Sequence, residues 1–99
     1  MKVLVAVSHE TDHAVLCNGA VWNGIKGYYD VNGLIKEQFW LPKSQVQETT
    51  SFLGKAFIGE EYLHVLEVPN WLAKNHGLKR YEWDGQTRIT KMPIMAFVG

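Results

Sequence analysis

The segment His9-Glu10-x-x-His13 matches the H-E-x-x-H pattern of zinc proteases. In that chemistry a helix puts both histidines on one face, and the glutamate activates a water bound to zinc. The flanking residues 3–7 and 14–17 are short apolar runs with β-branched members, which indicates strands, and no third-ligand motif follows. A zinc metallohydrolase is therefore a remote alternative, and we predict no catalytic residue, no metal ligand and no cofactor.

Nucleophilic chemistry has little support in the sequence. Cys17 is the single cysteine and follows the apolar run 14–16, so we expect a buried, inert thiol, because reactive cysteines need an accessible, electropositive setting. No serine stands in a Gly-x-Ser-x-Gly elbow, and no Gly-x-x-x-x-Gly-Lys loop is present for phosphate. These observations predict a protein without enzymatic activity. A single cysteine forms no internal disulfide, which favours a cytoplasmic location.

Composition places the chain among ordinary globular proteins. Its 99 residues are 46% hydrophobic and 20% charged, and this length predicts a single domain, residues 1–99. No apolar run approaches the roughly 18–20 residues that a membrane helix needs, so we predict no membrane partner. Ten Lys and Arg residues balance ten Asp and Glu residues, which argues against binding by strong electrostatic attraction.

Aromatic residues are the more informative group, at 12% of the chain. A hairpin that turns at Asp84-Gly85 would place two aromatic rings, a cation and an amide on one face: Tyr81, Trp83, Arg88 and Gln86. Such a face resembles the stacking platform of single-strand nucleic-acid binders, where each stacked base contributes roughly 1–3 kcal/mol. In the other interpretation, Tyr81 and Trp83 cover the edge of the core and Arg88 lies across Tyr81.

A second aromatic cluster surrounds Tyr28 and Tyr29. Adjacent residues of a strand point to opposite faces, so one of the two tyrosines must face solvent on a protruding hairpin. Exposed tyrosines are favoured anchors of protein interfaces. Lys43 follows a predicted strand, where it is either solvated or placed to contact a phosphate. The predicted partner-binding residues are therefore Tyr28, Tyr29, Lys43, Tyr81, Trp83 and Arg88.

Three dipeptides of the type that favours two-residue hairpin turns divide the chain. They are Asn18-Gly19, Asn32-Gly33 and Asp84-Gly85. The cross-strand pairs that follow from these turns are Leu16 with Val21, Tyr29 with Lys36, and Tyr81 with Arg88. Asn23-Gly24 offers a competing register for the first hairpin.

Hydrophobic periodicity predicts the strands that these turns connect. The predicted strands are residues 2–7, 36–41 and 62–68. The first is apolar on both faces, as in a central strand that is covered on both sides. In the second, Phe39 and Leu41 share one face and Trp40 lies on the other.

The rest of the chain contains one short helix, a loop and an apolar tail. The helix is predicted over residues 70–77, with Asn70 as its N-cap and Gly77 in the left-handed conformation at its end. Residues 43–55 are polar and lack a pattern, so we interpret them as a surface loop. The tail, residues 93–99, is either a last core strand or a contact with a partner, and edge pairing of this tail between two copies would give a homodimer.

Short strands, tight turns and one helix together predict a β-rich α+β fold. The expected architecture is a small antiparallel sheet or a partly open barrel of the OB or SH3-like kind, with the helix near residues 70–77. No internal repeat or low-complexity segment is present, which agrees with one domain.

Two sequence blocks resemble those of short phage and prophage proteins. Residues 39–46, Phe-Trp-Leu-Pro-Lys-Ser-Gln-Val, match a W-[LI]-P-K-S-Q block, and residues 68–78 match a [IV]-P-x-W-L-A…G-L block. Residues 10–16 resemble the stretch before the first block in the same group, and the resemblance covers about half of the chain. Residues 18–37 depart from the group, which has a single tight hairpin there. The resemblance implies a β-rich module of a mobile element, and it names no catalytic residue.

These observations favour a non-enzymatic binding module of phage or prophage type in the cytoplasm of a bacterial host. It would dock on a host or phage protein or nucleoprotein, and inhibition of a host defence complex is one consequence that such docking can have. The alternative is a small single-stranded nucleic-acid-binding protein of a phage replication or recombination cassette. In that case Trp83 and Arg88 would carry salt-dependent binding.

Overall fold

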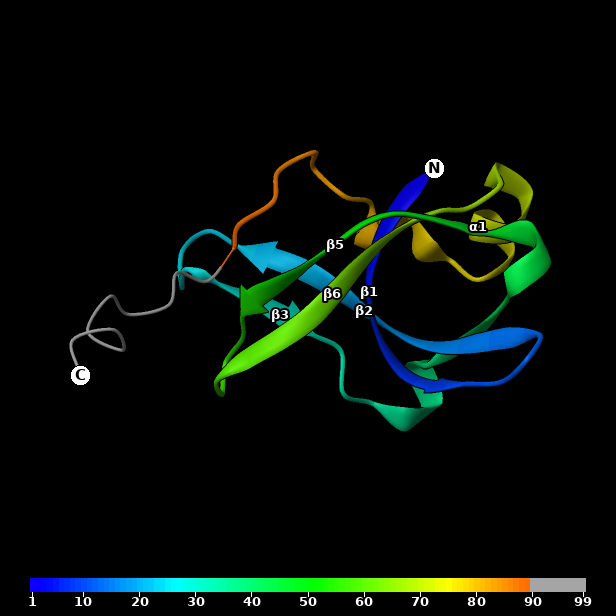
Figure 1. Cartoon of the computed structure of the whole chain (residues 1–99). Helices are drawn as coiled ribbons and strands as arrows, with labels where there is room; N and C mark the ends of the chain where they lie inside the picture. The colour runs from blue at the N-terminus through cyan, green and yellow to red at the C-terminus, as the bar shows by residue number, and fades with distance from the viewer. Residues whose placement is uncertain (90–99) are drawn as a thin grey trace, which may run out of the picture.

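Antiparallel strands make up most of the fold in the computed structural model, which describes residues 1–89 (Figure 1). The strands of this part are β1 (Lys2–Glu10), β2 (Ala14–Asn23), β3 (Tyr28–Val31), β4 (Phe39–Pro42), β5 (Gln47–Lys55) and β6 (Glu60–Glu67). Its helical elements are α1 (Asn70–Asn75) and the 3₁₀ turns η1 (Ile35–Glu37), η2 (Lys43–Gln45) and η3 (Leu78–Tyr81). No helix within residues 1–89 has the length and apolar character needed to cross a membrane.

The strands form one open sheet in the order β3-β2-β1-β6-β5, and β4 also pairs with β2. β2 uses residues 14–17 to pair with β4 and residues 20–23 to pair with β3. All strand pairs among the described residues are antiparallel. The prediction of a β-rich fold with one short helix is therefore confirmed.

β1 lies in the middle of the sheet, and its residues 3–6 are buried on both faces, as the sequence predicts. One face contributes to the helix-side core, which contains Val3, Val5, Val15, Cys17, Phe39, Leu41, Leu66, Val68, Leu72, Ala73, Leu78 and Tyr81. The other face contributes to the opposite core, which contains Leu4, Ala6, Ala20, Tyr29, Phe52, Leu63 and Val65. Figure 1 shows α1 at one end of the sheet, near the N-terminus.

The first predicted turn is wrong, because Asn18 and Gly19 lie in the middle of β2. The backbone of Gly19 lies against the buried ring of Tyr81, and a Cβ atom at position 19 would overlap that ring. Glycine serves here for a close approach, which the sequence pattern does not distinguish from a turn. The real bend joins β2 to β3 at residues 24–27, where Gly27 has a φ of 74°.

The second predicted hairpin is also wrong. Val31 ends β3 and pairs with Ala20, and the chain then forms η1 rather than a returning strand. Asn32 makes a tertiary contact instead of a hairpin turn, since its side chain donates a hydrogen bond to the Tyr81 hydroxyl at 2.9 Å. The competing signal at Asn23 lies at the start of the real bend, where its side-chain oxygen accepts two backbone hydrogen bonds.

A turn does form at the third dipeptide, where Gly85 has a φ of 87°, but the hairpin predicted around it is wrong. Tyr81 belongs to η3 rather than to a strand paired with Arg88. The indole N–H of Trp83 donates to the Gln86 carbonyl at 2.8 Å, which closes the turn. A local turn signal thus predicts the bend and not the strands beside it.

Two further predictions concern β4 and β5, which lie at edges of the sheet. In β4 the predicted alternation is confirmed, because Phe39 and Leu41 are buried and Trp40 is exposed. The interpretation of residues 43–55 as a surface loop is wrong, since most of them form the edge strand β5. Its first residues are polar because they face solvent, while Phe52 enters the opposite core, and a half-solvated edge strand resembles a loop in sequence.

α1 confirms the predicted helix, and Gly77 after it takes the left-handed conformation with a φ of 63°. Asn70 is not the N-cap, because Pro69 holds that position. The Asn70 side chain instead accepts a hydrogen bond from the Met1 amino group at 3.3 Å. The predictions for residues 93–99 lie outside the described residues.

Candidate functional site

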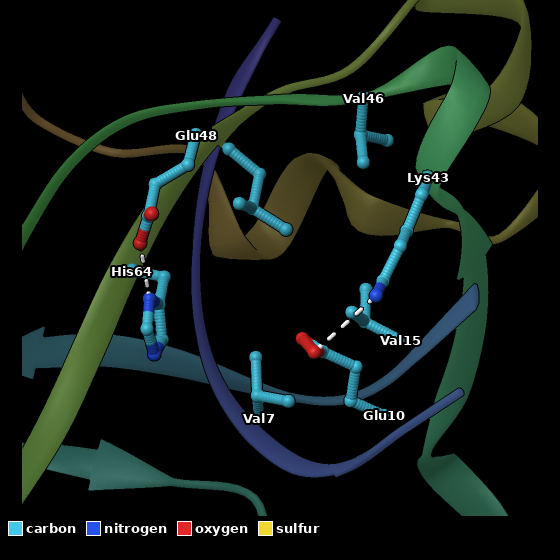
Figure 2. Close-up of a pocket in the computed structure, with 8 residues that line it drawn as sticks. Val7, Glu10, Val15, Lys43, Val46, Glu48 and His64 are labelled. Carbon is cyan, nitrogen blue, oxygen red and sulfur yellow. Dashed lines mark hydrogen bonds and ion pairs between the residues drawn. The ribbon is translucent and has the colours of Figure 1, made fainter. Parts of the chain in front are cut away.

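A pocket of about 350 Å³ lies between the ends of β1 and β2, η2 and the start of β5. We call it the rim pocket, and its lining residues are Val7, Glu10, Val15, Lys43, Val46, Glu48, His64 and Leu66. Figure 2 shows two pairs of polar side chains on opposite sides of this pocket, Glu48 with His64 and Glu10 with Lys43, together with valine side chains. The pocket therefore combines an apolar floor with a charged rim.

The floor is an extension of the hydrophobic core. Val15 and Leu66 belong to the helix-side core, and Val7 and Val46 pack against it. The rim pocket is thus the place where this core meets solvent. An apolar group placed there would leave water for a hydrophobic surface, which is favourable.

A β-bulge in β1 directs Glu10 into the rim pocket. The register of β1 against β2 shifts between Val7 and His9. Regular alternation would put Glu10 on the face opposite Val7. With the shift, Glu10 pairs with Val15 and shares the face that lines the pocket.

A second bulge, in β5, directs Glu48 into the rim pocket. The register of β5 against β6 shifts between Glu48 and Thr50. Thr50 pairs with Val65 of the opposite core, and without the shift Glu48 would lie on that same face. With the shift, Glu48 pairs with Leu66, which lines the rim pocket. Bulges are over-represented beside active sites, where they re-aim a side chain, and here two of them bring two carboxylates to one pocket.

Each of these carboxylates has a basic neighbour on the rim. Lys43 Nζ lies 3.2 Å from Glu10 Oε2, and His64 Nδ1 is hydrogen-bonded to Glu48 Oε1. The glutamate side chains remain 60% and 50% exposed, so the two pairs contribute little to stability. Their exposure leaves both carboxylates accessible to a ligand.

Of the predicted partner-binding residues, Lys43 is the one that lines the rim pocket. The sequence pattern assigns Glu10 to a zinc motif and gives no signal that Glu48 or His64 belongs to a site. Alternation along each strand predicts the wrong face for both glutamates, because the bulges leave no local sequence signal. The rim could therefore be found only in the folded structure.

Two of the predicted partner-binding tyrosines are buried. Tyr29 and Tyr81 are 1% and 4% exposed, so neither ring is available at the surface in this fold. The ring of Tyr81 stacks on Phe39 in the helix-side core, with centroids 6.1 Å apart. Tyr28 is half-buried beside Phe57 at 5.8 Å, so it is the more exposed of the two neighbouring tyrosines.

Trp83 and Arg88 do not form the predicted open face with Tyr81. The Arg88 guanidinium lies 4.5 Å from the Trp22 ring and 2.9 Å from the Asp84 carboxylate, and Trp83 packs against the opposite core. Partial burial acts to raise the pKa of Asp84, but hydrogen bonds from the backbone after it and from Arg88, with the charge of Arg88, hold that pKa below its usual value. The contacts of Arg88 and Trp83 are therefore made with other residues of the same fold, and they replace the predicted open face.

The H-E-x-x-H segment is not helical. β1 ends at Glu10, and residues 11–13 form the bend to β2. The Thr11 hydroxyl accepts a hydrogen bond from the backbone N–H of Ala14 at 3.1 Å, which supports this bend. The two histidines therefore lack the shared helix face of zinc proteases. Residues 1–89 contain no group of three or more His, Cys, Asp or Glu side chains placed to hold a metal ion.

Cys17 is fully buried, as predicted, and desolvation raises the pKa of its thiol to about 12. At pH 8 such a thiol is ionised in about one molecule in 10⁴. We expect a thiol reagent at pH 8 to label the native protein at least about 100-fold more slowly than the urea-unfolded protein. Mass spectrometry of timed samples measures both rates, and equal rates would contradict the burial of this thiol.

The two sequence blocks, residues 39–46 and 68–78, meet beside the rim pocket. Residues 44–47 and 68–70 line a shallow groove of about 560 Å³ together with Met1 and Glu67. Val46 lines both the groove and the rim pocket. The two hollows therefore adjoin at Val46.

Comparisons of the chain with known protein families, with curated proteins and with solved structures find no match. The resemblance of residues 39–46 and 68–78 to phage proteins therefore stays a prediction. The function has to be inferred from the geometry and chemistry of the rim pocket.

Proposed function

We propose that this chain is a non-enzymatic binding module of phage or prophage type that docks on a host or phage protein or nucleoprotein. The observation that carries the proposal is the apolar floor of the rim pocket, which is flanked by the pairs Glu10–Lys43 and Glu48–His64, with both glutamates directed to the pocket by bulges. An apolar centre within a polar rim is the usual anatomy of a protein interface. We expect the module to act in the bacterial cytoplasm and to inhibit a host defence complex by docking on it.

The balance of charge supports a protein as the partner. Tyr81 is buried and Trp83 is half-buried, so the stacking face that single-stranded nucleic acid would need is not open. Ten cations against ten anions give little attraction for a phosphate backbone. We therefore treat nucleic acid as the alternative partner, which the pull-down experiment below distinguishes from a protein.

We also propose that the sheet is a partly open barrel of the OB or SH3-like kind. The support is an isolated bridge between Tyr29 of β3 and Ala56 after β5. These two strands stand at opposite ends of the strand order, so the bridge brings the ends of the sheet toward each other. OB-like barrels commonly present a binding surface on one side of a small curved sheet.

A pull-down from a bacterial lysate with variants that fill the pocket tests the docking proposal. Val46→Trp places a large ring in the rim pocket, and Val21→Trp makes the same change on an exposed position of β2 as the control. We expect a protein partner to be retained by the wild type and by Val21→Trp, and at least about tenfold less by Val46→Trp, because interface energy concentrates in filled pockets. The retained protein is identified by mass spectrometry, purified and titrated by calorimetry.

Glu48→Lys, with Glu60→Lys as its control, provides a second pair of variants that changes charge rather than volume. Circular dichroism confirms the fold of each variant before the pull-down. Recovery of no protein at gentle salt would contradict the proposal, and so would a partner that binds Val46→Trp and Glu48→Lys as well as the wild type. A bound species that nuclease removes would support the nucleic-acid alternative instead.

A further inference from the structure

We infer that the partner inserts a basic side chain with an aliphatic stem, a lysine or an arginine, into the rim pocket. This inference rests on the proposed docking function and names the chemistry of the anchor. The apolar floor fits the stem, and the two glutamates fit the cationic head.

The shape of the pocket suits a single long side chain. Val7, Val15, Val46 and Leu66 provide the apolar surface of the floor. Lysine and arginine bury their methylene groups along such a surface while the charged head stays at a polar edge. A volume of about 350 Å³ lies at the small end of the range for ligand sites, which favours one side chain over a larger ligand.

The rim leaves hydrogen-bond acceptors for the head of that side chain. Lys43 engages Oε2 of Glu10, and His64 engages Oε1 of Glu48. Among the described residues, the second oxygen of each carboxylate, Glu10 Oε1 and Glu48 Oε2, has no such partner. A carboxylate can accept about four hydrogen bonds, and a guanidinium or ammonium group supplies charge-assisted donors.

The balance of charge at the rim selects a cation over an anion. The pocket is lined by two glutamates and one lysine, and His64 adds a positive charge only when it is protonated. The rim is therefore net negative while the imidazole is neutral. An anion would have to approach both carboxylates and compete with Glu10 for the Lys43 ammonium group, whereas a cation meets two half-exposed carboxylates.

Titration of ¹⁵N-labelled protein with n-butylguanidinium, followed by NMR, tests the inference. This probe carries an aliphatic stem and a guanidinium head, and butyrate serves as the anionic probe of similar size. We expect n-butylguanidinium to shift resonances of the rim pocket with a millimolar Kd, as is typical of a fragment this small. Glu48→Gln is expected to raise this Kd at least about fivefold, while Glu60→Gln, at the far end of β6, leaves it unchanged.

Lys43→Met is expected to change the Kd of n-butylguanidinium in the direction opposite to Glu48→Gln. Removing the ammonium group frees Oε2 of Glu10 as well and makes the rim more negative, so n-butylguanidinium is expected to bind at least about twofold more tightly. An anion site would respond in the other direction, because it would lose its one permanent cation. Weaker guanidinium binding by Lys43→Met, or tighter binding of butyrate than of n-butylguanidinium, would overturn the inference.

The two proposals fail in different ways. If n-butylguanidinium leaves the pocket resonances unchanged while the lysate partner still depends on Val46, the basic anchor is wrong and docking stands. If n-butylguanidinium binds as expected but no protein partner is recovered, docking on a protein is wrong and the preference of the pocket for a basic group stands.

Discussion

Replacing Tyr29 by alanine is expected to lower the free energy of unfolding by about 3–5 kcal/mol, the usual cost of deleting a buried aromatic side chain. Tyr29 is 1% exposed, and its ring centre lies 4.9 Å from that of Trp22 and 5.6 Å from that of Phe52. Its hydroxyl accepts a hydrogen bond from the Arg88 backbone N–H at 3.3 Å. The substitution therefore leaves a cavity and an unpaired donor. Urea unfolding followed by circular dichroism measures the change.

Tyr28→Ala is the matched control, because it deletes the same ring from the next residue of the same strand. Tyr28 is half-buried, and its ring contacts the exposed Phe57 at 5.8 Å. We expect a loss of about 1 kcal/mol or less. Equal losses for the two variants, or a larger loss for Tyr28→Ala, would show that the wrong tyrosine is assigned to the core.

Replacing Gly19 by alanine is expected to lower the free energy of unfolding by about 2–3 kcal/mol through overpacking. A Cβ atom at this position would overlap the ring of Tyr81, which is held in the helix-side core and cannot move freely. Relief of the overlap requires a shift of β2 or of η3. Thermal and urea unfolding of the variant measure the loss.

Gly33→Ala is the control for this substitution. A Cβ atom at Gly33 would have no heavy atom within 4 Å, and the residue does not have a positive φ. We expect a change within about 0.5 kcal/mol of the wild type. If Gly19→Ala is as stable as Gly33→Ala, the close packing of Tyr81 on β2 is wrong.

The residues expected to carry stability differ from those of the proposed binding site. Tyr29 and Gly19 act in the two cores, whereas Glu10 and Glu48 are half-exposed rim residues whose contacts with Lys43 and His64 contribute little to stability. Charge-neutralising changes at the rim are therefore suited to binding experiments, because we expect the protein to remain folded when they are made.

Periodicity predicted the strands whose burial alternates regularly or is complete. β1 was predicted because its apolar residues fill both faces, and β4 because Phe39 and Leu41 alternate with Trp40. β5 was not predicted, because an edge strand keeps polar side chains in solvent while its backbone pairs with β6. Burial of side chains is visible in the sequence, whereas pairing of the backbone is not.

Turn signals were correct only where local geometry alone decides the conformation. Gly77 and Gly85 both have positive φ, as the helix-end and turn signals predict. Asn18 and Gly19 have the same local signature as a turn, but the approach of Tyr81 decides their role. Tyr81 is far from Gly19 in the chain, so no window of sequence around Gly19 contains this information.

The sequence by itself determined the β-rich class, the central buried strand, the helix near residues 70–77 and the burial of Cys17, because each depends on residue types within a short window. The tertiary structure alone decided which tyrosine is buried and which residues form the rim pocket. Two bulges reverse the faces of Glu10 and Glu48, and their partners Lys43 and His64 come from other parts of the chain. A site made by strand register across distant segments exists only once the sheet has formed.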